Sequence, residues 1–148
     1  MVVMISKNRE CLNSRGARVI RYLARGLLVI LPKRAGDAVA RFLLRLWFGA
    51  GHIDAQRQDG RWVCLDFNEM DKLLHGADHK RFGRNNFFPV MRHLVKPGTV
   101  VIDIGTSYGD EVIELSELAG DGGIVYAIEP NAVSYRSLCR TVDLNGLS

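Results

Sequence analysis

Acidic residues and glycines near the end of the chain have the types and spacing of a small-molecule binding site. Asp103 begins the pattern D-x-G-x-x-x-G-D, and Glu129 follows further along. Gly105 in this pattern lets the backbone turn tightly, and it admits a ligand where a Cβ atom would block one. A carboxylate such as Glu129 can accept hydrogen bonds from both hydroxyls of a ribose. The residues therefore predict a site for a ligand that carries a ribose.

Two classes of cofactor fit such a turn. A dinucleotide requires G-x-G-x-x-G and places its pyrophosphate at the bare N-terminus of a helix. The third glycine is missing here, and Asp103, Asp110 and Glu111 would repel a phosphate. S-adenosylmethionine (SAM) has a sulfonium and an ammonium group and no phosphate, so the acids favour SAM over NAD. In the alternative interpretation, the acids of an ordinary α/β turn simply face solvent.

Two strands must carry these acids. Residues 99–104 and 124–128 are continuous apolar runs rich in β-branched side chains, which is typical of parallel strands buried on both faces. Each run is followed by a helical pattern, over 110–119 and from 130 to a cap at Asn145-Gly146. The β-α-β-α order predicts a parallel sheet, the start of a Rossmann-like doubly wound α/β fold. Its strand ends would hold Asp103 and Glu129 at the same edge.

Three segments, at residues 100–110, 125–131 and 143–147, resemble the beginning of FkbM-type SAM-dependent methyltransferases, which are Rossmann-like class I enzymes. Lys96-Pro97-Gly98 before the first strand is also similar to that family. The resemblance covers about residues 60–148, and its specific motifs lie in the last fifty residues. Typical members methylate hydroxyl oxygens of sugars or natural products, so the resemblance implies a small-molecule hydroxyl acceptor.

The resemblance also implies which residues would contact SAM. The predicted cofactor-binding residues are Asp103, Gly105, Thr106, Tyr108, Gly109 and Glu129. The first aspartate and the two glycines would line the methionine side, and Glu129 would hold the ribose. Thr106-Ser107 stands where the family usually has Ala-Asn, which keeps small polar residues in the turn. No residue of the sequence is identified as the catalytic base.

The length of the chain bears on activity. A class I methyltransferase has a seven-stranded sheet, and the segment described above contains only the first two strands. We therefore expect this chain to be the N-terminal part of a methyltransferase, inactive by itself and binding SAM weakly or not at all. Open strand edges predict an aggregation-prone or dimerising product.

The front of the chain is basic. Residues 1–50 hold ten basic and two acidic side chains, whereas residues 99–148 hold two and eight. Apolar residues repeat at helical spacing over 17–31 and again after Asp37, a predicted N-cap, as far as 48. Such stripes pack on a core or a partner, or they form a peripheral contact of residues 17–48 with an anionic membrane. The second case gives an alternative function, a non-enzymatic docking module with a vestigial nucleotide fold.

These patterns divide the chain into a basic helical segment (1–51), a lead-in (52–98) and a truncated SAM-binding domain (99–148). In the lead-in, residues 61–67 resemble a strand that follows a turn at Asp59-Gly60. Residues 82–86 are expected to be a loop and 87–95 a short helix. His75 and His79 are four residues apart, but Gly76 interrupts the helix and no third ligand follows, so no metal is predicted. These two and His93 are interpreted as scaffold.

Composition excludes several other classes. The chain has 148 residues, of which 47% are hydrophobic, so it can form a folded domain. Cys11, Cys64 and Cys139 form no CxxC pair, which favours a reducing, cytoplasmic compartment. No apolar run has the length of a membrane span. The arginines lie on helical faces without interleaved aromatics, so nucleic acid is not an expected partner.

Overall fold

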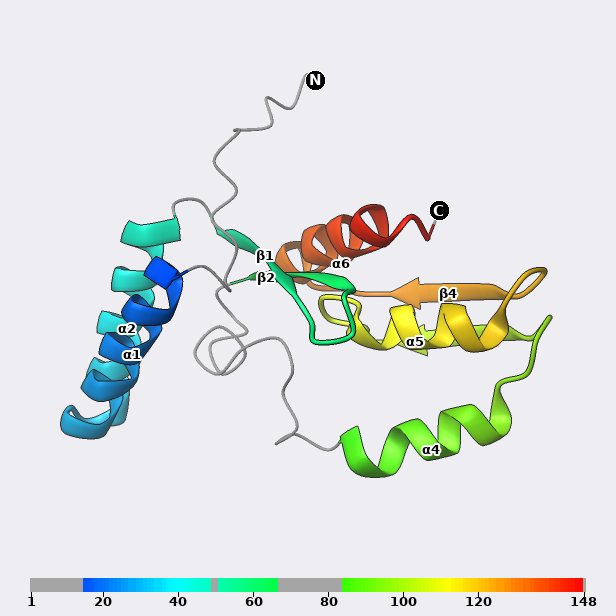
Figure 1. Cartoon of the computed structure of the whole chain (residues 1–148), viewed down its shortest axis with the longest axis horizontal. Coiled ribbons are helices and arrows are strands. Elements are labelled where there is room, and N and C mark those ends of the chain that lie inside the picture. The colour runs from blue at the N-terminus through cyan, green and yellow to red at the C-terminus, as the bar shows by residue number, and fades with distance from the viewer. Residues whose placement is uncertain (1–14, 49–50, 67–83, 148) are drawn as a thin grey trace, which may run out of the picture.

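The computed structural model describes residues 15–48, 51–66 and 84–147, which form a mixed α/β arrangement (Figure 1). In chain order its elements are α1 (Arg15–Ile30), α2 (Lys33–Phe48), β1 (His52–Gln56), β2 (Trp62–Asp66), α4 (Arg84–Leu94), β3 (Val100–Ile104), α5 (Asp110–Ala119), β4 (Ile124–Ile128) and α6 (Ala132–Asn145). The strands make two separate sheets of two strands each, one antiparallel (β1–β2) and one parallel (β3–β4).

The predicted β-α-β-α unit is confirmed in β3, α5, β4 and α6. The two strands pair in parallel, with Val100 opposite Ile124 and Ile104 opposite Ile128. Asp110 and Glu111 lie in the first turn of α5, where carboxylates interact favourably with the helix dipole. Asn131 caps the N-terminus of α6, and Gly146 ends it in a left-handed conformation. The pattern of apolar runs, turns and caps was therefore sufficient to place these four elements.

The prediction that these strands are buried on both faces is wrong. Side chains alternate along β3 and β4 between half-buried and exposed, and Ile104 at the end of β3 is 77% exposed. Helix α5 contacts both strands from one side. Among the described residues, the other face is uncovered, and it consists of Val100, Ile102, Ile104, Ile124, Tyr126 and Ile128. A continuous apolar run therefore did not imply two covered faces.

The antiparallel hairpin packs on α6. Strand β2 and the turn at Asp59-Gly60 agree with the prediction, whereas β1 was not foreseen. The backbone N–H of Cys64 donates to Thr141 Oγ1 at 2.9 Å, and the Ser134 hydroxyl donates to Asp66 Oδ2 at 3.2 Å. At the other end, Asn145 bonds both the N–H and the carbonyl of Trp62. These hydrogen bonds join residues that are 68 to 83 positions apart in the chain.

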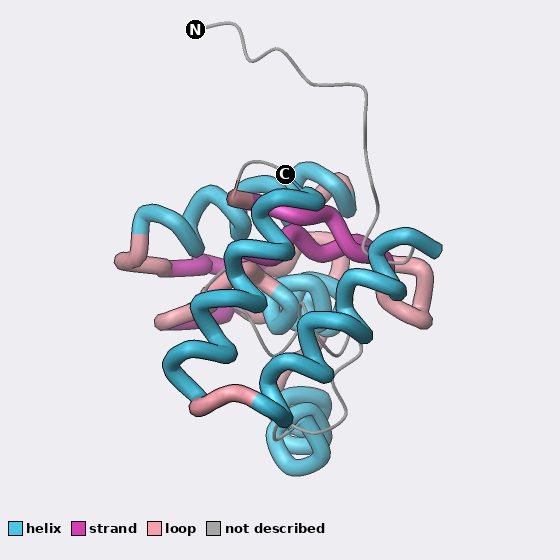
Figure 2. Tube along the Cα trace, turned by 90° about the vertical axis from the view of Figure 1, so that its left-hand side faces the viewer, coloured by secondary structure: helices cyan, strands magenta, loops and turns pink. Residues whose placement is uncertain are grey.

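Helices α1 and α2 form an antiparallel pair (Figure 2). Small side chains allow a close approach, because Ala24 and Ala40 are fully buried and a Cβ on Gly16 would lie 2.5 Å from the Trp47 ring. The predicted helix over 17–31 is confirmed. Asp37, however, lies inside α2 and is not its N-cap, because the N–H of Gly36 already donates to Pro32 O. The turn at Pro32 starts the second helix earlier than the side-chain pattern indicated.

Helix α4 begins earlier than predicted. Residues 84–86, expected to be loop, already belong to it, and Pro89 lies inside the helix. The polar residues at its start carry no apolar periodicity, so the pattern could not reveal them. His75 and His79 lie outside the described residues, so their predicted role is not addressed. Helix α4 lies beside α5, on the side away from α6 (Figure 1).

Candidate cofactor-binding site

The acidic ends of β3 and β4 meet at one edge of the parallel sheet. Because Ile104 is opposite Ile128, the residues that follow each strand leave the sheet side by side. The backbone N–H groups of Gly105 and Thr106 donate to Ile128 O at 2.8 and 3.4 Å. The glycine turn after β3 therefore crosses the end of β4, next to Glu129.

Glu129 holds this turn in place through its carboxylate. Its Oε2 accepts a hydrogen bond from the N–H of Ser107 at 2.8 Å, and its Oε1 accepts one from the N–H of Asn131 at 2.7 Å. Ser107 has a φ of 52°, a left-handed conformation that is uncommon for a residue with a side chain. A carboxylate can accept about four hydrogen bonds, so each oxygen of Glu129 retains acceptor capacity for a ligand hydroxyl.

The two glycines of the turn serve different purposes. Gly105 has a φ of 85°, and a Cβ added there would meet no atom of the described residues within 4 Å. The backbone is thus open to an approaching ligand at this position. Gly109 has a φ of 87°, and its added Cβ would lie 2.7 Å from Leu138 Cδ1. Gly109 therefore permits close packing between the start of α5 and α6.

Two polar atoms beneath the turn have no hydrogen-bond partner among the described residues. They are Asp103 Oδ2 and Thr106 Oγ1, and the residue Thr106 is only 2% exposed. Burial raises the pKa of the Asp103 carboxyl, and the nearby Asp110 carboxylate raises it further. A buried polar group without a partner is costly, and an acid between another acid and an apolar strand is stabilised by a cation. This edge of the sheet therefore has the electrostatic character of a cation site.

Tyr108 occupies a different environment from the other predicted residues. It is 2% exposed and belongs to the hydrophobic core, in one cluster with Val63, Leu65 and Ile113. Its place in this cluster connects the turn to the β1–β2 hairpin. Any contribution of Tyr108 to a ligand site would come from fixing the shape of the turn.

The structure thus brings together most of the residues predicted from the sequence. Asp103, Gly105, Thr106 and Glu129 gather at the sheet edge, and Gly109 begins α5 beside them. The prediction did not include Ser107, whose backbone N–H links the two strand ends. Its position in the D-x-G-x-x-x-G pattern was visible, but its left-handed backbone was not.

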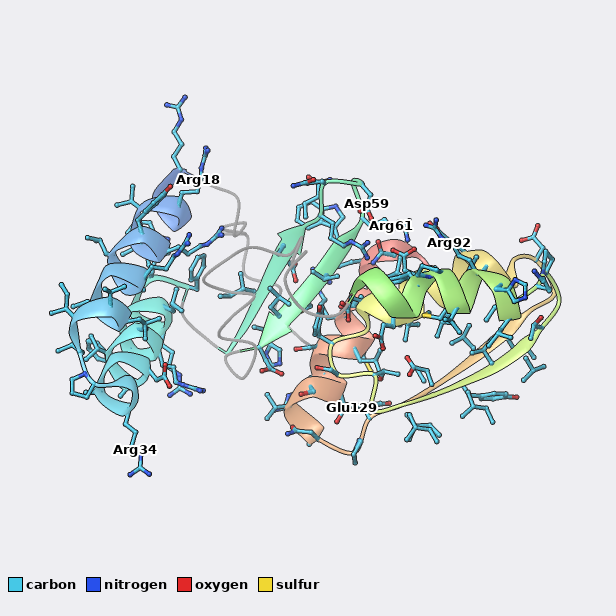
Figure 3. All side chains as sticks on the ribbon, turned by 90° about the horizontal axis from the view of Figure 1, so that it is seen from below. Arg18, Arg34, Asp59, Arg61, Arg92 and Glu129 are labelled. Atoms are coloured by element: carbon cyan, nitrogen blue, oxygen red, sulfur yellow. The ribbon has the colours of Figure 1, made fainter. Side chains whose placement is uncertain are left out.

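A hollow lies elsewhere on the molecule, away from the sheet edge. It has a volume of about 720 Å³ and is lined by Arg57, Asp59, Arg61, Phe88, Pro89, Arg92 and Glu114. Figure 3 shows Asp59, Arg61 and Arg92 on the opposite side from Glu129. Arg57 pairs with both Asp59 and Glu114 at 2.7 Å. These ion pairs connect the hairpin turn to α5, which indicates a structural junction.

Comparison of the chain with protein-family models, with curated proteins and with solved structures returns no match. Within the described ranges, no group of three or more His, Cys, Asp or Glu side chains could hold a metal ion. None of the helices described is long and apolar enough to cross a membrane. The case for a function therefore rests on the geometry of the sheet edge.

Proposed function

We propose that the edge formed by β3, the glycine turn and Glu129 binds SAM, and that the chain provides the cofactor-binding part of a methyltransferase acting on a hydroxyl oxygen. In this proposal the two parallel strands and their helices are the first part of a Rossmann-like doubly wound sheet. The observation that carries the proposal is Asp103 Oδ2, a buried carboxylate oxygen without a hydrogen-bond partner among the described residues, near the turn that Glu129 holds with a carboxylate that can accept further hydrogen bonds.

The roles of the residues follow from their chemistry. When bound, SAM supplies an electrophilic methyl group on a positively charged sulfur. Asp103 would accept a hydrogen bond from the ammonium group of the methionine part, which offsets the cost of its own desolvation. Glu129 would accept hydrogen bonds from the ribose hydroxyls with the lone pairs that Ser107 and Asn131 leave free. Gly105 would let the ligand contact the backbone.

The same geometry supports SAM over a dinucleotide. A pyrophosphate at the start of α5 would lie near Asp103, Asp110 and Glu111, and all three carboxylates would repel it. Bound phosphates in dinucleotide folds instead meet a helix N-terminus free of nearby acids. The ligand that fits three acids is a cation.

Two-dimensional NMR of the full chain tests the proposal. We expect millimolar SAM to shift the amide resonances of Gly105, Ser107 and Asn131, and NAD to leave them in place. Glu129→Ala should weaken this response by about tenfold or more, because a charge-assisted contact contributes roughly 1.5–3 kcal/mol. The matched control is His93→Ala, which changes an exposed side chain in the last turn of α4, outside the glycine turn, and should leave the response intact.

Two outcomes would overturn the proposal. One is a larger shift of these amides with NAD than with SAM. The other is a SAM-induced shift of the turn amides that Glu129→Ala leaves unchanged, in a variant whose CD spectrum shows that it is folded.

A further inference from the structure

Both N-terminal helices carry an apolar stripe that remains exposed in the pair. The stripe residues recur at helical spacing, i, i+4 and i+11 on α1 and i, i+3 and i+7 on α2. They and their exposed fractions are Val19 (60%), Leu23 (57%), Ile30 (80%), Val39 (36%), Phe42 (63%) and Leu46 (73%). The contact between the two helices does not bury these large apolar side chains.

The two stripes lie on the same side of the pair. On α1, Leu23 directly precedes the buried contact residue Ala24, and on α2, Val39 directly precedes the buried contact residue Ala40. Each residue turns an α-helix by about 100°. Each stripe is therefore rotated in the same sense about its own helix axis, away from the buried contact residue. Because the two helices run in opposite directions, this places both stripes on the same side of the pair. We call this side, formed by the six residues above, the apolar side.

The opposite side of the pair carries arginines, beside the exposed side chains of Tyr22 and Val29. Arg25 directly follows Ala24, and Arg41 directly follows Ala40, so both lie across the contact from the stripes. Arg18, Arg34 and Arg45 are exposed and lie on the same side of their helices as these two arginines. Figure 3 shows Arg18 and Arg34 extending away from the molecule at the two ends of the pair.

Positive charge is concentrated in these helices. Residues 15–48 contain eight basic side chains and one acidic side chain, Asp37. Partial burial lowers the pKa of Arg21, and the adjacent charges of Arg25 and Arg18 lower it further. Like charges crowded on one pair of helices are stabilised by an external anionic partner.

From this arrangement we propose that the α1–α2 pair lies in the interface of an anionic membrane, with its apolar side among the upper acyl chains and its arginines near the lipid phosphates. Helices with one apolar face, one Arg-rich face and low overall hydrophobicity bind membranes in this way. The proposal does not depend on SAM binding, since it involves other elements of the fold.

A lipid surface fits both sides of the pair better than other partners do. Nucleic acid would contact the arginines and leave Leu23 and Phe42 in water. A lipid interface accepts the apolar side chains, and arginine is long enough to reach back to the headgroups. Aromatic side chains are also favoured at this depth, and Trp47 is 42% exposed on α2.

Sedimentation of the full chain with vesicles tests the proposal. We expect binding to vesicles of phosphatidylcholine mixed with phosphatidylserine, little binding to phosphatidylcholine alone, and loss of binding at high salt. The double variant Arg18→Gln/Arg25→Gln should reduce partitioning by roughly thirty-fold, because each basic residue near such a surface contributes about 1 kcal/mol. Arg136→Gln, which removes an exposed arginine of α6, is the charge control.

The apolar contribution needs its own control, because the β3–β4 sheet also exposes apolar side chains. Leu23→Ser/Phe42→Ser should abolish vesicle binding, whereas Ile102→Ser/Tyr126→Ser, at similarly exposed positions of the sheet, should retain it. CD spectra would verify that each variant is folded. Binding that is lost only in the sheet variant, that is equal on neutral vesicles, or that is absent altogether would overturn the proposal. Self-association through the apolar side without vesicle binding would overturn it as well.

Discussion

The carboxylate of Glu129 accepts a hydrogen bond from the backbone N–H of Ser107 at 2.8 Å, so the end of β4 fixes the turn that follows β3. The two residues are 22 positions apart in the chain. Because the second oxygen of Glu129 bonds Asn131, the same side chain also orients the N-cap of α6. One acid thus sets the relative position of the two segments that would contact a cofactor.

Glu129→Gln tests this role independently of any ligand. Glutamine offers one carbonyl oxygen in place of two carboxylate oxygens, so it can satisfy only one of the two backbone N–H groups. We expect a loss of about 1 kcal/mol in the free energy of unfolding. Amide hydrogen exchange should become faster at Ser107 or Asn131 and remain unchanged in β1. If Glu129→Gln changed amide exchange to the same extent along the whole chain, an anchoring role for Glu129 would be contradicted.

Asp103→Asn separates stability from ligand binding. Folding raises the pKa of Asp103, so the folded chain holds this proton more tightly than the unfolded chain does. The unfolding free energy contributed by this group is therefore highest below the ordinary carboxyl pKa of 3.8, and it falls as pH rises through the raised value. Above the raised pKa, the ionised group destabilises the fold.

Accordingly, we expect the asparagine variant to have a higher Tm than the parent chain at pH 7, and the difference to shrink as pH falls toward 3.8. The same variant should respond less to SAM, because it lacks the charge that a cation requires. Asp121→Asn, at an exposed turn position, is the control and should leave Tm nearly unchanged. A lower Tm at pH 7 for Asp103→Asn would mean that its carboxylate is stabilised by a contact within the chain.

The two glycines of the turn give a matched pair of substitutions. Gly109→Ala should cost about 2–4 kcal/mol, because it combines left-handed strain with a methyl group 2.7 Å from Leu138 Cδ1. Gly105→Ala should cost only the strain, about 1–2 kcal/mol, since its new methyl group has no neighbour within 4 Å in the described ranges. Urea unfolding measures both. Equal losses in the two variants would show that the contact with Leu138 relaxes freely.

Local sequence patterns predicted the elements of this fold better than they predicted how the elements pack. The glycine turn, the two strands of the parallel sheet and the caps of α6 depend on neighbouring residues, so they were visible in the sequence. The pairing of β2 with α6 depends on Thr141 and Asn145, far along the chain, and no periodicity encodes such contacts. Tyr108 illustrates the difference, because its place in the turn was predictable and its burial in the core was not.

The exposure of one face of β3 and β4 was not predicted for the same reason, because it depends on packing between distant elements. An apolar run such as 100–104 indicates that a strand can be covered on both sides. Whether each side is covered depends on where other elements pack, and α5 contacts the strands from one side. The same holds for the turn residue Ser107. Its backbone conformation is set by the carboxylate of Glu129, which approaches it only in the folded chain.

The last prediction concerns Arg57, which joins the hairpin turn to α5. Its side chain is 4% exposed and contacts Glu114 Oε1 at 2.7 Å. Arg57→Ala would leave the carboxylate of Glu114, itself 11% exposed, with the longer 3.4 Å contact to Arg61 as its remaining ion pair in the described part of the chain. Removing one partner of a buried pair typically costs about 3–5 kcal/mol. We expect the lower end of this range, because Arg61 compensates in part and because Arg57 Nε and Nη1 lack partners among the described residues.

Arg92→Ala is the control, since Arg92 lines the same hollow but is exposed, and it should change the unfolding free energy by less than about 0.5 kcal/mol. The double variant Arg57→Met/Glu114→Gln should recover much of the loss, because removing both charges leaves no unpaired ion in the junction. Urea denaturation followed by CD of this double variant and of the single variants Arg57→Met and Glu114→Gln forms a double-mutant cycle, which gives the coupling between the two residues. If Arg57→Ala is no more destabilising than Arg92→Ala, the ion pair does not hold the hairpin to α5, and other contacts of the hairpin, such as those with α6, fix it in place.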